Sequence, residues 1–133
     1  MQKILKYNQN HLKYLLNQGK ISIVFAIIIL IINNLIEYNL LSISIYIFVM
    51  VVYYIIAYFY KKSKGYLTIE GDFIKKNIFF GGAVNLKEIV DIQKFHDEYY
   101  FVTTSKKFYI NSALLDEEGK KIILEIIDNI IKE

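Results

Sequence analysis

Few side chains in this sequence belong to the types that carry catalytic or metal chemistry. Cysteine is absent, which excludes thiolate nucleophiles, disulfides and thiolate metal ligands. The two histidines, His11 and His96, are far apart in the sequence. His96 begins the densest polar cluster, with Asp97 and Glu98, but a zinc site usually needs three or four converging ligands. We therefore interpret this cluster as a solvated turn between two strands.

Two further motifs resemble catalytic patterns and have simpler explanations. Gly81 and Gly82 lack the lysine and the Ser or Thr residue of a phosphate-binding loop, so they predict a turn. Asp116, Glu117 and Glu118 form a carboxylate cluster that is typical of the start of a helix. We therefore expect no catalytic residue, no metal site and no cofactor, and we predict that the protein is not an enzyme.

The sequence is dominated by two apolar runs, residues 21–36 and 40–60, which Glu37, Tyr38 and Asn39 separate. A helix needs about 20 mainly apolar residues to cross about 30 Å of hydrocarbon. The second run is long enough by itself, and the first becomes long enough when it starts at Lys20. Residues 20–60 are therefore predicted to form a two-helix transmembrane hairpin.

The lysines flank this hairpin on both sides. Residues 1–20 contain four lysines and no acid, a basic linker at residues 61–64 adds three more, and the connection carries Glu37. Because positively charged flanks stay in the cytoplasm, we expect a multi-pass protein of the plasma membrane with both termini cytoplasmic. The apolar residues of 1–19 fall partly on one helical face, which predicts an interfacial helix on the cytoplasmic surface. The residues expected at the membrane interface are Lys20, Tyr58, Tyr60, Lys61 and Lys62.

Residues 65–133 have the pattern of a small α+β domain. Apolar residues alternate from residue 65 onward, and turn signals occur at Gly71, Gly81, His96 and Ser105. The sequence predicts about six short strands, over residues 66–70, 73–80, 83–86, 89–95, 98–104 and 107–111. Such strands predict a bent antiparallel sheet or open barrel. Asp116 is the expected N-cap of a closing helix, whose apolar stripe must be buried against the barrel. The stripe consists of Ile123, Ile126, Ile127, Ile130 and Ile131.

The charge of this domain argues against nucleic acid as a partner. Residues 65–133 contain nine lysines and twelve acids, whereas nucleic-acid binding needs a basic face that neutralises phosphates. The expected partners are the lipid bilayer and a protein. Tyr100, if it faces solvent, and His96 are the residues predicted for an interaction surface, and the hairpin offers a route to homo-oligomers.

A two-span hairpin that runs into a strand meander with a C-terminal helix resembles the bacterial pleckstrin-homology-like (PH-like) membrane proteins. The stretches that carry the resemblance are residues 65–74 (GYLTIEGDFI), 85–92 (NLKEIVDI) and 114–131. The family fold has seven strands and the sequence indicates six, so one strand is missing, merged or misread. The resemblance implies a binding module. It does not extend to a phosphoinositide site, because the first turn, Glu70 to Asp72, is acidic.

Two functions follow from these features. The first is a membrane-anchored binding or scaffolding protein on the inner face of the plasma membrane, with self-immunity against a membrane-active bacteriocin or toxin as one form that the resemblance allows. The alternative is a structural or accessory subunit of a membrane transport or envelope complex. A bacterial source is indicated by the absence of arginine and the abundance of Lys, Ile, Asn and Tyr, which are typical of AT-rich genomes.

Overall fold

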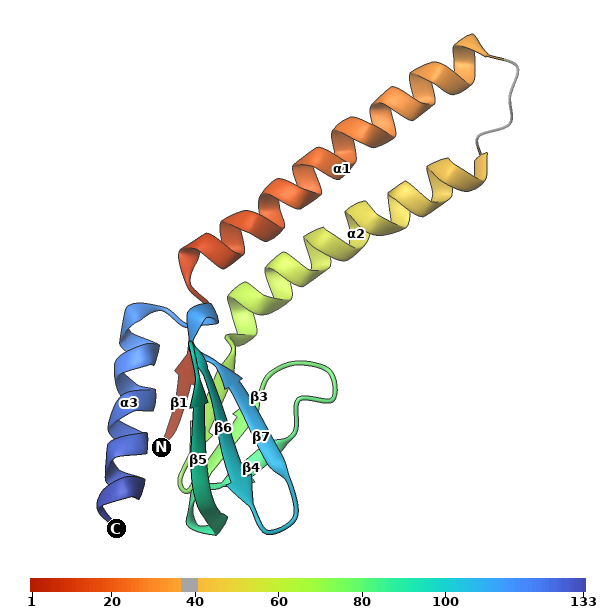
Figure 1. Ribbon diagram of the computed structural model, residues 1–133. Coiled ribbons are helices and arrows are strands. Elements are labelled where there is room, and N and C mark those ends of the chain that lie inside the picture. Colours follow the sequence, from red (N-terminus) through yellow and green to blue (C-terminus); the bar gives the residue numbers. More distant parts are fainter. Residues whose placement is uncertain (37–40) are drawn as a thin grey trace. The chain divides into compact units, whose positions relative to one another are not determined.

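The computed structural model describes residues 1–36 and 41–133, so the predicted connection at Glu37 to Asn39 lies outside the described residues. The chain divides into two compact units. One is a helical hairpin, residues 10–61. The other, which we call the β domain, combines residues 1–9 with residues 62–133 (Figure 1). The β domain is therefore discontinuous in sequence, and the hairpin is inserted near its N-terminus.

The hairpin consists of α1 (Gln9–Leu35) and α2 (Leu41–Lys64). Both helices are long and apolar enough to cross a membrane, which agrees with the two predicted spans. Only 11% of the most apolar part of α1 and 0% of that part of α2 is buried. The helices approach closely at Gly19, where an added Cβ would lie 3.6 Å from the Cβ of Tyr54. Asn34 donates a hydrogen bond from its side chain to the carbonyl of Leu30 at 3.0 Å, so its amide is used within α1.

The β domain contains two antiparallel sheets and a C-terminal helix, which confirms the predicted α+β layout. Among the described residues, seven strands are present, one more than the sequence indicated. The four-stranded sheet has the order β1 (Gln2–Leu5), β2 (Leu67–Glu70), β3 (Phe73–Lys76) and β4 (Ala83–Asn85). The three-stranded sheet has the order β5 (Ile89–Phe95), β6 (Glu98–Thr103) and β7 (Lys107–Asn111). Two single-turn helices, η1 (Leu86–Glu88) and η2 (Ser112–Leu114), and the closing helix α3 (Glu117–Lys132) complete the domain.

The extra strand, β1, corrects the prediction of a helix over residues 1–19. Gln2–Leu5 pair with β2 in an antiparallel register that places Gln2 opposite Glu70 and Leu5 opposite Leu67, and the helix begins only at Gln9. The predicted domain, residues 65–133, was incomplete for the same reason. The helical spacing of a few apolar residues is a weak local preference, and pairing with a distant strand overrides it.

The N-terminal segment is held from two sides within the β domain. On one side, Leu5 accepts a hydrogen bond from the backbone N–H of Tyr66 at 2.8 Å. On the other, Lys6 accepts one from the N–H of Asp116 at 3.1 Å, and the N–H of Asn8 donates to Leu114 at 2.8 Å. Leu5 is only 2% exposed and Tyr7 only 4%. Leu5 and Tyr7 therefore belong to the core of a domain whose remainder follows the hairpin, while residues 1–4 and 6 are exposed.

Side chains from both sheets and from α3 make the core of the β domain. Fully buried residues include Leu67 and Ile74 of the first sheet and Phe101 and Ile110 of the second. Helix α3 runs along the strands (Figure 1) and begins as predicted, because the Asp116 carboxylate accepts a hydrogen bond from the Gly119 N–H at 2.8 Å. The predicted apolar stripe is buried only in part. Ile123 and Ile127 are in the core, Ile126 and Ile130 are half-buried, and Ile131 is exposed.

Gly65 joins α2 to β2 at a position where a side chain does not fit. Its φ is +72°, and an added Cβ would lie 2.6 Å from Cγ2 of Ile4 and 2.8 Å from the carbonyl oxygen of Leu5. Gly71, in the β2–β3 turn, has a φ of +58° but no heavy atom within 4 Å of an added Cβ.

We expect Gly65→Ala to destabilise the β domain clearly more than Gly71→Ala. Both substitutions carry the cost of a left-handed backbone, about 1–2 kcal/mol, and Gly65→Ala adds overpacking against β1, about 1–3 kcal/mol. Chemical unfolding of the two full-length variants in detergent measures the difference. Equal loss of stability would show that β1 does not pack against Gly65.

Candidate functional site

The residues predicted for the membrane interface lie along the two long helices. Lys20 is exposed on α1, Tyr60 and Lys62 are exposed on α2, and Tyr58 and Lys61 are half-buried there. Lys61 lies near the other helix, because its Nζ is 3.1 Å from Nε2 of His11. The structure therefore brings a lysine from the end of the hairpin together with a histidine from its beginning, a pairing that the sequence did not reveal.

Between residues 15–23 of α1 and residues 54–59 of α2, the two helices line an open cavity of about 240 Å³. Its surface is almost entirely apolar, and it borders Gly19, where the helices approach closely. A cavity of this kind offers apolar contact and no set of polar groups that would orient a reactant. Other lining residues are Leu15, Ile23, Tyr54 and Tyr58.

Tyr100 lies in an aromatic and acidic cluster on the three-stranded sheet. Its hydroxyl donates to one carboxylate oxygen of Glu98 at 3.1 Å, and the hydroxyl of Tyr109 donates to the other at 3.0 Å. The rings of Tyr100 and Tyr109 are 5.3 Å apart, and Nζ of Lys76 is 4.6 Å from the centre of the Tyr109 ring. Tyr109 was missed in the sequence because its place depends on register: it is paired directly with Tyr100 across β6 and β7.

The tyrosines of this cluster stay protonated at neutral pH. Burial, with the hydrogen bond to Glu98 as the next contribution, raises the pKa of Tyr109 to about 12. The hydrogen bond to Glu98 also raises the pKa of Tyr100. Both phenols therefore act as hydrogen-bond donors to one carboxylate, and the cluster is an ordered aromatic and acidic surface.

His96 occupies the β5–β6 turn, as predicted, and is exposed. Its φ is +55°, and its ring stacks edge-on against that of Phe95 with the centroids 4.6 Å apart. A shallow pocket of about 210 Å³ contains His96, Asp97 and Glu98 together with Asn111. Within residues 1–36 and 41–133, no group of three or more His, Asp or Glu residues is placed to hold a metal ion.

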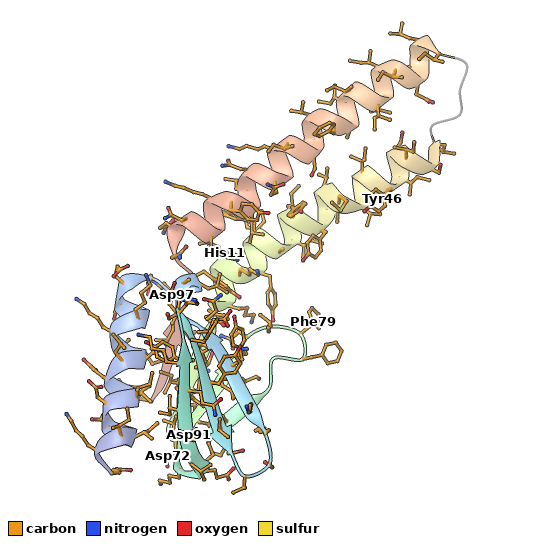
Figure 2. All side chains as sticks on the ribbon, in the orientation of Figure 1. His11, Tyr46, Asp72, Phe79, Asp91 and Asp97 are labelled. Atoms are coloured by element: carbon orange, nitrogen blue, oxygen red, sulfur yellow. The ribbon has the colours of Figure 1, made fainter. Side chains whose placement is uncertain are left out.

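A loop between β3 and β4 carries exposed apolar side chains that the sequence assigned to a strand. The strand predicted over residues 73–80 ends at Lys76. The next residues form a loop, residues 78–82, which we call the phenylalanine loop, and in it Phe79 is 88% exposed and Phe80 is 104% exposed. Figure 2 shows Phe79 on this loop, outside the two sheets.

Comparison of the chain with protein-family models, with curated proteins and with solved structures finds no match.

Proposed function

We propose that this protein is an integral membrane protein whose helical hairpin anchors the β domain to the inner face of a bacterial plasma membrane, where the domain binds a protein partner. The observation that carries the proposal is the exposure of the apolar helices. A core helix of a soluble protein buries its apolar face, whereas α1 and α2 leave isoleucine, leucine and phenylalanine side chains exposed along their length. A bilayer covers such a surface. A helix can lie in the hydrocarbon because all of its backbone hydrogen bonds are made within the helix.

The pairing of β1 with β2 supports the two-span topology. Because these strands share one sheet, the chain must lie on the same side of the membrane before α1 and after α2. Two crossings satisfy this condition. The lysines at residues 3, 6, 13, 61, 62 and 64 favour the cytoplasmic side for both ends.

The strand count supports the PH-like assignment of the β domain. Sheets of four and three antiparallel strands, followed by one C-terminal helix, agree with the seven strands of that fold once β1 is included. A PH-like domain is most often a binding module. The Tyr100–Glu98–Tyr109 cluster gives it an ordered aromatic surface of the kind that is enriched in protein interfaces. Protection against a membrane-active toxin is one form of this function.

Single cysteines should report the topology directly, because the native chain contains none. We expect a cysteine at Asn34 to react with a membrane-impermeant maleimide in intact cells. Cysteines at Gln2 and Lys107 should react only after the cells are lysed. Labelling of Gln2 and Lys107 on opposite sides would contradict both the topology and the pairing of β1 with β2.

A chimera tests where the function resides. Residues 10–61 are replaced with an unrelated two-span hairpin of the same orientation, while residues 1–9 and 62–133 remain, so that the complete β domain is kept. Restoration of the phenotype of a deletion strain is the expected result and assigns the function to the β domain. Failure of a properly inserted chimera would contradict the proposal and assign specific contacts to the native helices, as expected for a subunit of a membrane complex.

A further inference from the structure

We infer that the phenylalanine loop inserts into the lipid bilayer interface and provides a second membrane contact beside the helical hairpin. This inference rests on the proposed membrane anchoring. The phenylalanine loop belongs to the β domain, and the hairpin can anchor the protein without it.

The loop presents its apolar side chains to solvent. Ile78 is 39% exposed, Phe79 is 88% exposed and Phe80 is 104% exposed. Consecutive exposed aromatic residues are unfavourable in water, whereas phenylalanine at a membrane surface enters the boundary between headgroups and acyl chains.

The base of the loop is attached to the end of α2. The Asn77 side chain donates to the carbonyl oxygen of Lys64, the last residue of α2, at 2.9 Å. The backbone N–H of Asn77 donates to Tyr66 at 3.0 Å. If the bilayer interface lies at Tyr60 to Lys62, the residue that holds the loop is within one helical turn of it, about 5 Å along the axis. The base of the loop is therefore attached to the last residue of α2.

The charges around the loop fit an anionic membrane surface. Lys62 and Lys64 are exposed at the end of α2, and Lys75 is exposed on β3 shortly before the loop. No acidic residue occurs in residues 61–69 or 73–87. Lys106, from the β6–β7 turn, also donates to the carbonyl of Ala83, directly after the loop. Lysines at this position are attracted to anionic headgroups, which favours a bilayer over an apolar protein groove as the occupant.

The loop is also ordered before it meets lipid. Its ends are joined by a hydrogen bond from the N–H of Lys76 to Gly82 at 3.0 Å, and the N–H of Gly81 donates to Ile78 at 3.0 Å. Phe80 has a φ of +59°, an uncommon conformation for a bulky residue. Because the loop is already closed, insertion orders few additional backbone groups.

Tryptophan fluorescence tests the inference in the full-length protein, because the native chain has no tryptophan. Three single-tryptophan variants are reconstituted in vesicles of phosphatidylethanolamine and phosphatidylglycerol with brominated acyl chains. Phe80→Trp reports on the loop. Phe48→Trp, in the middle of α2, reports on the hairpin. Phe73→Trp is the matched control, because Phe73 is an exposed phenylalanine (52% exposed) at the opposite end of β3 and follows Asp72 in the sequence.

We expect Phe80→Trp to show blue-shifted emission and to lose most of its intensity when the lipid is brominated near the headgroups. Phe73→Trp should retain emission typical of water and its full intensity. Quenching of Phe48→Trp without quenching of Phe80→Trp would overturn the loop inference and leave the anchor intact. Absence of quenching at both positions would overturn both. Blue-shifted but unquenched emission from Phe80→Trp would indicate a protein occupant and would also overturn the inference.

Discussion

Replacement of Leu5 with aspartate should unfold the β domain, although Leu5 precedes the rest of that domain by the whole hairpin. Leu5 is 2% exposed and is paired with Leu67. The substitution removes a buried leucine and introduces a carboxylate without a partner, which we expect to lower the free energy of unfolding by at least about 3 kcal/mol. Loss of the buried leucine costs about 2–5 kcal/mol and an unpaired buried carboxylate costs several kcal/mol more. Together they approach the free energy of unfolding of a small domain, about 5–15 kcal/mol, so most of the fold should be lost.

Limited proteolysis of the full-length protein in detergent measures this effect. We expect rapid cleavage of residues 62–133 in Leu5→Asp, with α1 and α2 protected by the micelle. Lys3→Thr is the control on the same strand, since Lys3 is exposed, and it should change stability by no more than about 0.5 kcal/mol. Protease resistance of Leu5→Asp equal to that of the native protein would show that β1 is dispensable.

The second large effect is expected at α3, where two isoleucines one helical turn apart differ in burial. Ile127 is 6% exposed and Ile131 is 70% exposed. Ile127→Asp places a charge between α3 and the sheets and should cost at least about 3 kcal/mol. Ile131→Asp makes the same chemical change in water, where the unfavourable charge at a helix C-terminus costs about 0.3–1 kcal/mol.

Thermal unfolding of the two variants, followed by circular dichroism in detergent, separates burial from charge. We expect a large decrease in the midpoint for Ile127→Asp and a small one for Ile131→Asp. Equal midpoints would mean that α3 does not close the core through Ile127.

The sequence predicted correctly those elements whose signals lie within a short stretch of the chain. The two apolar runs correspond to α1 and α2, and Asp116 caps α3 through a hydrogen bond from Gly119, only three positions further along the chain. β1 was missed because its four residues, QKIL, have no alternating pattern and their partner lies beyond the hairpin. These residues form a strand because they pair with β2, and the residues that follow them bond to the segment before α3.

The same limit applies to the candidate surfaces, whose residues come together partly through strand pairing. Tyr100 was predicted for an interaction surface on the condition that it faces solvent, and it is half-buried. Glu98 lies two residues before it on β6, whereas Tyr109 joins the cluster only through the register of β6 and β7. The phenylalanine loop was taken as the continuation of β3 because residues 78–80 are apolar and aromatic, as strands prefer. The pairing continues for one more position on each side of β3, through the backbone N–H of Asn77 to Tyr66 and that of Lys76 to Gly82, and the chain then turns, with the N–H of Gly81 donating to Ile78.

The discontinuous β domain has a consequence for the order of events during synthesis. β1 leaves the ribosome before the hairpin, and its partner strand β2 leaves only after the hairpin. Closing a flexible loop of about 60 residues costs roughly 3–4 kcal/mol in chain entropy. A hairpin that has already formed removes most of that cost, because it brings its own ends together, with His11 and Lys61 3.1 Å apart. Insertion of the helices would thus act as the nucleation step for the sheet, and a chain that fails to insert would expose an unpaired strand to aggregation.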